Sequence, residues 1–370
     1  MTEHAIEIDR YGGPEELVWR AVRRPALGPG EVRIRTLYAA VNRADIEIRR
    51  GEWPVLQDDP FPHTPGLEVV GVVESAGAGV SRPAVGDRAI TMMQRLGGIW
   101  GERPGGYGEF VVVDAGTVAT IDTDVDLEQL AALGLAAVTA AEGLQRLGIA
   151  AVAPVAAAVR EGAGAPVASA APSTPAAPGA AAAPGAAVAP VAAGARVVVH
   201  GASGGVGSAA VTMAAAAGCE VVAVLRRAGK DDFVRGLGAA SVVRLDETSL
   251  LDALGARSVD AVLETTGERT FADSVAVLRR GGRLCLVGAL TGADLTVSAW
   301  DLIQDLELTG WSSENLTGDG LRARVAWIAG LVRDSRLRAP AIHRFALDDA
   351  AAAHAAIERG EIVGRALLCA

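Results

Sequence analysis

The feature that most constrains the fold of this chain is the stretch VVVHGASGGVGSAA at residues 197–210. An apolar run typical of a β-strand leads into a glycine-rich turn, and the turn leads into small residues that favour a helix. A turn of this kind often binds a phosphate, because glycine lets the backbone approach the anion and the helix N-terminus offers unpaired N–H groups. The alternative is a tight connection between strand and helix that binds nothing.

Strands and helices alternate after this turn. The strand-like runs are CEVVAVL, SVVRL, VDAVLE and GRLCLVGAL, and helical segments separate them. Continuous apolar strands that alternate with helices predict a parallel sheet covered on both faces, a doubly wound Rossmann α/β domain. In such a domain the turn holds the pyrophosphate of a dinucleotide. The first glycine of the usual fingerprint is Ala202 here, and the expected contacts are Ser203, Gly204, Gly205, Val206 and Gly207.

The residues after the second strand of this domain indicate which dinucleotide binds. An NAD-binding chain carries an acidic residue there to accept hydrogen bonds from the ribose. This chain instead has Arg226, Arg227 and Lys230, and its first acidic residue is Asp231. Since guanidinium groups bind a 2′-phosphate through charge-assisted hydrogen bonds, we expect NADP(H). The alternative is a basic turn that is simply solvated.

Residues 1–125 predict a different kind of domain. Short strand-like runs such as EVRIRTLYAAVN and LEVVGVVESAG are interrupted by Gly and Pro, which indicates a compact β domain. The apolar helical stretch LEQLAALGLAAVTAAEGLQRL follows it.

Residues 150–194 lie between this helical stretch and the glycine-rich turn, and 22 of these 45 residues are alanine and seven are proline. Proline breaks helices, so we do not expect this segment to span a membrane. Because Ala, Pro and Gly bury little apolar area per residue, we expect a flexible, disordered insertion.

The formal net charge of −10 argues against nucleic acid or an anionic membrane as the main partner. The N-terminus, MTEHAIEIDR, has no long apolar run, so we expect a cytoplasmic protein. The three cysteines, Cys219, Cys285 and Cys369, are too widely spaced to predict a disulfide framework or a metal motif.

Four motifs together resemble the medium-chain dehydrogenase/reductase superfamily, and within it the zeta-crystallin-like quinone oxidoreductase family. They are VNRADIEIRRGEWP, HTPGLEVVGVVE, GGYGEF and VHGASGGVG. The resemblance implies a GroES-like catalytic domain at residues 1–125 and 312–370. It also implies an NADP-binding Rossmann domain at residues 126–311, and we expect a homodimer.

The zinc ligands of the superfamily's alcohol dehydrogenases are replaced in this chain. By the resemblance, Asn42, Leu67 and Leu135 stand where those enzymes carry Cys, His and Cys, and residues 92–106 lack the cysteines of the structural zinc lobe. Leucine has no ligating atom and Asn is a poor zinc ligand. We therefore expect a zinc-free member.

Without zinc, hydride transfer to an activated double bond is easier than alcohol oxidation, since the conjugated carbonyl of the substrate takes the charge. We therefore expect an NADPH-dependent reductase of a small molecule, a quinone or an α,β-unsaturated carbonyl compound. The candidate catalytic residues are Asn42 and Tyr107, with Trp53 and Leu67 in the substrate pocket. The alternatives are a turn residue for Asn42 and an aromatic side chain that packs the β domain for Tyr107.

The family pattern implies further cofactor contacts. They are Thr139, Thr265, Gly267, Val287, Gly288, Ala289 and Arg365, of which Arg365 is equally compatible with a surface charge. Two other functions stay open: a specialised biosynthetic enzyme with one elaborate substrate, and a non-catalytic NADPH-binding protein.

Overall fold

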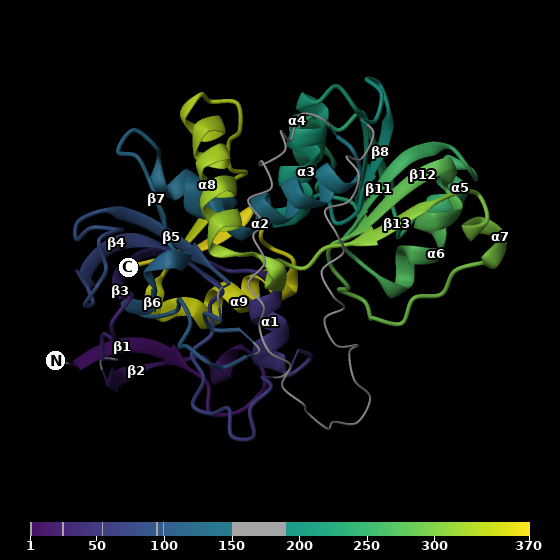
Figure 1. Cartoon of the computed structure of the whole chain (residues 1–370). Helices are drawn as coiled ribbons and strands as arrows, with labels where there is room; N and C mark the ends of the chain where they lie inside the picture. Colours follow the sequence, from purple (N-terminus) through teal and green to yellow (C-terminus); the bar gives the residue numbers. More distant parts are fainter. Residues whose placement is uncertain (1, 24–25, 54, 94, 99, 150–189) are drawn as a thin grey trace.

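The computed structural model describes residues 2–23, 26–53, 55–93, 95–98, 100–149 and 190–370, and Figure 1 shows them as two lobes. One lobe is built on a six-stranded sheet and the other on a seven-stranded sheet. A separate antiparallel hairpin, β1 (Thr2–Glu7) with β2 (Val18–Arg23), lies near the N-terminus. The short 3-10 helices are η1 (Pro14–Glu16), η2 (Ala115–Thr117), η3 (Ser313–Asn315) and η4 (Leu347–Asp349).

The six-stranded sheet is parallel at every pairing. Its order is β10 (Ser241–Arg244), β9 (Glu220–Leu225), β8 (Arg196–Val199), β11 (Val259–Glu264), β12 (Leu278–Leu286) and β13 (Glu307–Gly310). The strand order runs in opposite directions from β8 and from β11. This reversal is the place where a doubly wound sheet binds its ligand.

Helices cover both faces of this sheet because successive apolar side chains of each strand point to opposite faces. Val197 and Val221 pack on the side of α3 (Gly205–Ala216) and α4 (Asp231–Gly236). Val198 and Val222 pack on the side of α5 (Leu250–Leu254) and α6 (Glu268–Ala276), while α7 (Ala299–Leu302) precedes β13. The predicted Rossmann domain is therefore confirmed.

The seven-stranded sheet combines both ends of the chain. Its order is β14 (Ile342–Ala346), β15 (Arg365–Cys369), β3 (Glu31–Ala40), β4 (Glu68–Ala76), β5 (Arg88–Met92) and β7 (Ala119–Thr120), and β6 (Phe110–Asp114) also pairs with β3. The helices of this lobe are α1 (Arg43–Arg50), α8 (Gly318–Arg333) and α9 (Ala350–Arg359). The last strand, β15, pairs antiparallel with β3, with Leu367 opposite Ala40. The boundaries between the two domains, at residues 125 and 312, stay a prediction.

The helix α2 (Leu127–Arg146) joins the two lobes, since it packs on α3 as well as on α8 and β3. Of the described helices it is the one long and apolar enough to cross a membrane, but 78% of its apolar stretch is buried inside the protein. Its helical path is interrupted at Gly134, where φ is +33°. A Cβ at Gly134 would lie 2.0 Å from a carboxylate oxygen of Glu68, so the interruption makes room for that carboxylate.

Residues 150–189 of the expected insertion lie outside the described residues. The described chain on the two sides of this segment meets, because the amide of Val191 donates a 2.8 Å hydrogen bond to the carbonyl of Gly148. The described chain therefore stops and resumes at one place in the domain, beside the end of α2.

Candidate functional site

The glycine-rich turn lies between β8 and α3, at the point where the strand order reverses. The amide of Gly204 donates to the carbonyl of Gly201 at 2.8 Å, and the first amide that bonds within α3 is that of Ser208, to Gly204. A Cβ at Gly207 would lie 2.2 Å from the carbonyl oxygen of Gly201, so only glycine fits there. The N–H groups of the first helical turn, which starts at Gly205, are thus presented at the C-terminal edge of the sheet, where they can bind an anion.

One further turn adjoins the glycine-rich turn, and a third turn adjoins that one. The turn at Thr265–Gly267 follows β11, and the turn at Val287–Ala289 follows β12. They are joined because the amide of Thr291 donates to the carbonyl of Thr266 at 2.8 Å. A Cβ at Gly201 would lie 2.7 Å from Oγ1 of Thr265. The structure thus brings together the predicted cofactor residues of three separate strands.

The predicted basic residues lie at the end of β9, the strand next to β8. Arg226 and Arg227 are exposed, while Nζ of Lys230 donates to the carbonyl of Ile362 at 2.8 Å. Burial lowers the pKa of Lys230, and the nearby charges of Arg227 and Arg226 lower it further. Nη2 of Arg227 donates to the carbonyl of Arg359 at 3.3 Å, so the three cations follow β9 within five residues, one strand away from the glycine-rich turn.

Arg365 is buried between the two lobes instead of lying on the surface. Its Nε donates to the carbonyl of Ala132 at 2.9 Å, and its Nη2 donates to Oε1 of Glu68 at 3.2 Å. A Cβ at Gly205 would lie 2.5 Å from its Nη1. Arg365 therefore touches the start of α3 in the nucleotide-binding lobe and at the same time neutralises Glu68, a buried carboxylate of its own lobe.

The amide of Asn42 is fully engaged inside the protein. Its Nδ2 donates to Oε1 of Glu68 at 2.9 Å, and its Oδ1 accepts from Nη2 of Arg365 at 3.1 Å. Asn42 is 7% exposed and caps the N-terminus of α1. This arrangement favours the structural alternative for Asn42 over the expected hydrogen bond to substrate.

Glu68 is the common partner of Asn42 and Arg365, which both donate to its Oε1. Its other oxygen accepts from the amide of Leu135 at 2.7 Å. Burial raises the pKa of Glu68, and Arg365 opposes that rise. Glu68 is not among the predicted site residues, because none of its partners lies near it in the chain. The kink at Gly134, which frees the amide of Leu135 for Glu68, was not predictable from the glycine alone.

Tyr107 is fully buried in an apolar cluster. Its hydroxyl donates to Oδ2 of Asp45 at 3.2 Å and lies 3.0 Å from Nε2 of His354. Burial raises the pKa of Asp45 to about 7 and lowers that of His354 to about 3. Tyr107 has no exposed surface for a substrate, so the structure favours the packing alternative for it.

The positions of the lost zinc ligands are apolar or internally bonded. Leu67 and Leu135 are buried, and the described residues contain no group of three His, Cys, Asp or Glu side chains that could hold a metal ion. Trp53 is half-buried and packs on the same core. The hydroxyl of Thr139 donates to the carbonyl of Leu135 at 2.9 Å, one helical turn back, so its oxygen keeps only acceptor capacity.

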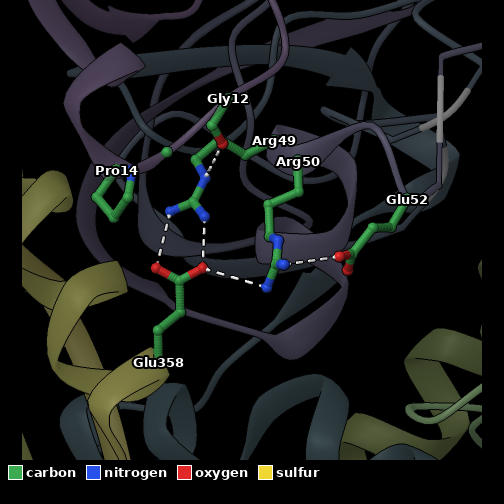
Figure 2. A pocket seen from close by; sticks show the side chains of 7 residues that line it. Gly12, Pro14, Arg49, Arg50, Glu52 and Glu358 are labelled. Carbon is green, nitrogen blue, oxygen red and sulfur yellow. Dashed lines mark hydrogen bonds and ion pairs between the residues drawn. The ribbon is translucent and has the colours of Figure 1, made fainter.

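A surface pocket of about 510 Å³ lies beside η1, α1 and α9 (Figure 2). Arg49 pairs with Glu358 at 2.6 Å, and Arg50 pairs with Glu52 at 2.9 Å. The two arginines and two glutamates that line the pocket therefore compensate one another's charge. The pocket includes none of the predicted site residues and is not a candidate active site.

The fold and the site define a medium-chain dehydrogenase/reductase. Residues 28–123 match the alcohol dehydrogenase GroES-like domain, which confirms the predicted GroES-like fold, and residues 205–312 match the zinc-binding dehydrogenase domain. Within this superfamily the chain belongs to the zinc-independent quinone oxidoreductase family, a family of oxidoreductases.

Three relatives illustrate the likeness. The quinone oxidoreductase of Sus scrofa is 28% identical over 77% of this chain and 73% of its own length. A 2-haloacrylate reductase of Burkholderia sp is 25% identical over 83% of this chain and 78% of its own length. A mycobacterial protein solved in complex with NADPH is 26% identical, with a TM-score of 0.75 over the whole of both chains.

Proposed function

We propose that this chain binds NADPH and transfers hydride from it to a quinone or an α,β-unsaturated carbonyl compound, without a metal ion. The observation that carries the cofactor choice is the basic cluster of Arg226, Arg227 and Lys230 beside the glycine-rich turn. Two relatives support the substrate class, since one is a quinone oxidoreductase and the other a 2-haloacrylate reductase. A relative solved in complex with NADPH supports the cofactor.

NADPH, when bound, would supply the hydride. The first turn of α3 would hold its pyrophosphate, and the basic cluster would hold its 2′-phosphate. The substrate would take up the hydride, and its conjugated carbonyl oxygen would take the negative charge, so the protein mainly has to position the reactants. Because the polar groups of Asn42 and Tyr107 are engaged internally, we propose water as the source of the proton.

The first prediction tests the cofactor choice. Replacing both Arg226 and Arg227 with alanine should lower kcat/KM for NADPH at least about 10-fold, because even one guanidinium–phosphate hydrogen bond contributes about 1.5–3 kcal/mol. The value for NADH should change little. The measurement is reduction of 1,4-benzoquinone and of a simple enone at varied cofactor concentration.

A double variant with alanine at Arg336 and Arg338 is the matched control, since it removes two exposed charges from another part of the surface. An unmutated protein that uses both cofactors equally well would contradict the proposal. Tight NADPH binding without turnover of any quinone or enone would favour a non-catalytic role or one elaborate substrate.

We also propose that two copies pair through β13. Within the described chain this edge strand pairs only with β12, and all four of its residues are exposed. Trp300 and Ile303, just before it, are 77% and 61% exposed. An open strand edge beside exposed apolar side chains is a template for pairing with another chain.

The second prediction follows from this edge. A variant with glutamate at Trp300 and lysine at Ile303 should sediment as a monomer at concentrations where the unmutated protein is a dimer. Charged side chains cannot be desolvated cheaply at an interface, so the association constant should fall at least about 100-fold. An unmutated protein that sediments as a monomer would contradict the proposal.

A further inference from the structure

A fully buried carboxylate, that of Glu264, lies at the C-terminal end of β11. Its Oε1 accepts from the amide of Thr266 at 2.8 Å and from that of Gly267 at 3.4 Å. Its Oε2 accepts from the hydroxyls of Thr270 at 3.0 Å and Ser274 at 2.6 Å. Four donors on two sides of one carboxylate fix both its position and theirs.

The two amides belong to the turn that follows β11, which is one of the three turns of the candidate cofactor site. Gly267 has a φ of +88°, and a Cβ there would lie 2.7 Å from the carbonyl oxygen of Gly292. The segment after β12 is hydrogen-bonded to the turn after β11, because the amide of Thr291 donates to the carbonyl of Thr266. The side chain of Glu264 therefore holds one turn directly and a second turn through it.

The same carboxylate also reaches the glycine-rich turn. Ser274 donates to Glu264 and lies 2.9 Å from Nε2 of His200, the residue that directly precedes Gly201. The hydroxyl of Thr265 donates to the carbonyl of His200 at 3.1 Å. Burial lowers the pKa of His200, and the carboxylate of Glu264, 3.4 Å from its Nε2, opposes this change. Because Ser274 gives its own proton to Glu264, Nε2 of His200 donates to Ser274.

We propose that Glu264 is a positioning residue that pre-sets the three turns of the cofactor site before NADPH arrives. The inference rests on the proposed function for the identity of the ligand. It does not rest on that function for the claim that the turns are rigid before any ligand binds. Binding to turns that are already ordered avoids an entropy loss, so loss of this carboxylate weakens cofactor binding more than it slows hydride transfer. Glu264 touches neither reactant in this scheme.

The third prediction compares two carboxylates of β11. Glu264→Gln keeps the shape but has a single acceptor oxygen, so either the turn amides or the helix hydroxyls lose their partner. Asp260→Asn is the matched control. Asp260 lies near the opposite end of the same strand and accepts from the amide of Arg196 at 2.7 Å and from Arg279 at 2.5 Å.

Amide hydrogen exchange of the protein without cofactor should become at least about 10-fold faster at Thr266 and Gly267 in Glu264→Gln only. NADPH titrated by its fluorescence should bind about 10-fold more weakly, while kcat at saturating NADPH and the preference over NADH stay within about 2-fold. Ser274→Ala removes one donor to Oε2 of Glu264 together with the Ser274 link to His200, but it leaves both turn amides bonded, so it should give a smaller change of the same kind.

Glu264→Met removes every acceptor and should extend the series; if it does not fold, the other variants still decide. Glu264→Gln that exchanges and binds NADPH like Asp260→Asn would overturn the inference. If the unmutated protein does not bind NADPH, the proposed function fails, whereas the exchange at Thr266 and Gly267 still tests Glu264.

Discussion

Replacing Arg365 with methionine is expected to lower the free energy of unfolding by about 3–5 kcal/mol, because it leaves the buried carboxylate of Glu68 without its cation. The side chains of Arg365 and Glu68 are only 7% and 3% exposed, so water cannot replace the lost partner. Methionine keeps the length and most of the apolar stem of arginine. Urea unfolding followed by circular dichroism measures the loss.

The pH dependence of this loss separates charge from packing. The pKa of Glu68 is already raised by burial, and removal of Arg365 raises it further. An acid with a raised pKa in the folded state stabilises the protein below its unfolded pKa, near 4.5, and this stability is lost as the pH rises through the folded value. The deficit of the variant should therefore grow as the pH rises above the folded pKa of Glu68 in the unmutated protein, which itself lies above 4.5.

Glu68→Gln combined with Arg365→Met is the control for this pair, since it removes both charges. It should recover part of the loss but not all of it. Asn42 and Leu135 donate to different oxygens of Glu68, and glutamine has only one oxygen that can accept. A deficit that is independent of pH and additive in the double variant would mean that the ion pair contributes nothing.

The other large effect is expected at Gly207. Gly207→Ala places a Cβ 2.2 Å from the carbonyl oxygen of Gly201 and 2.7 Å from the Cα of Ala202, both of them backbone atoms that have no flexible end to move. We expect the free energy of unfolding to fall by about 3 kcal/mol. NADPH affinity should fall at least about 10-fold, because the first turn of α3 is displaced from the anion it would bind.

Gly236→Ala is the matched control, as a Cβ at this exposed helical glycine meets no atom within 4 Å. It should be neutral or stabilise the protein by up to about 1 kcal/mol. Thermal unfolding with and without NADPH measures both effects. Equal melting temperatures for the two variants would show that α3 shifts without cost.

The parts of the fold that the sequence predicts are those with local signals. The glycine-rich turn and the apolar strands around it predict the doubly wound sheet from residues that are neighbours in the chain. The basic cluster after β9 is equally local. Its place beside the glycine-rich turn follows once the parallel order of β8 and β9 is assumed.

The parts that the sequence does not predict depend on residues far apart in the chain. Tyr107 meets His354 across 247 positions and Arg365 meets Glu68 across 297, and no spacing rule connects such pairs. For the same reason the sequence predicts a substrate contact for Asn42, whereas its amide bonds to two partners inside the protein. From the sequence, Glu264 is simply the residue that ends an apolar strand.

The position of β15 bears on how the chain is made. Residues 38–40 of β3 pair with residues 367–369, so this part of the sheet stays open until residues 367–369 have been made, roughly 15–65 s after residues 38–40. The strands of the other lobe lie within residues 196–310 and are all available earlier. The nascent chain therefore carries a folded nucleotide domain and an unfinished β-sheet with an exposed edge. Chaperones that shield strand edges during synthesis should matter more for the yield of this protein than for that of the isolated nucleotide domain.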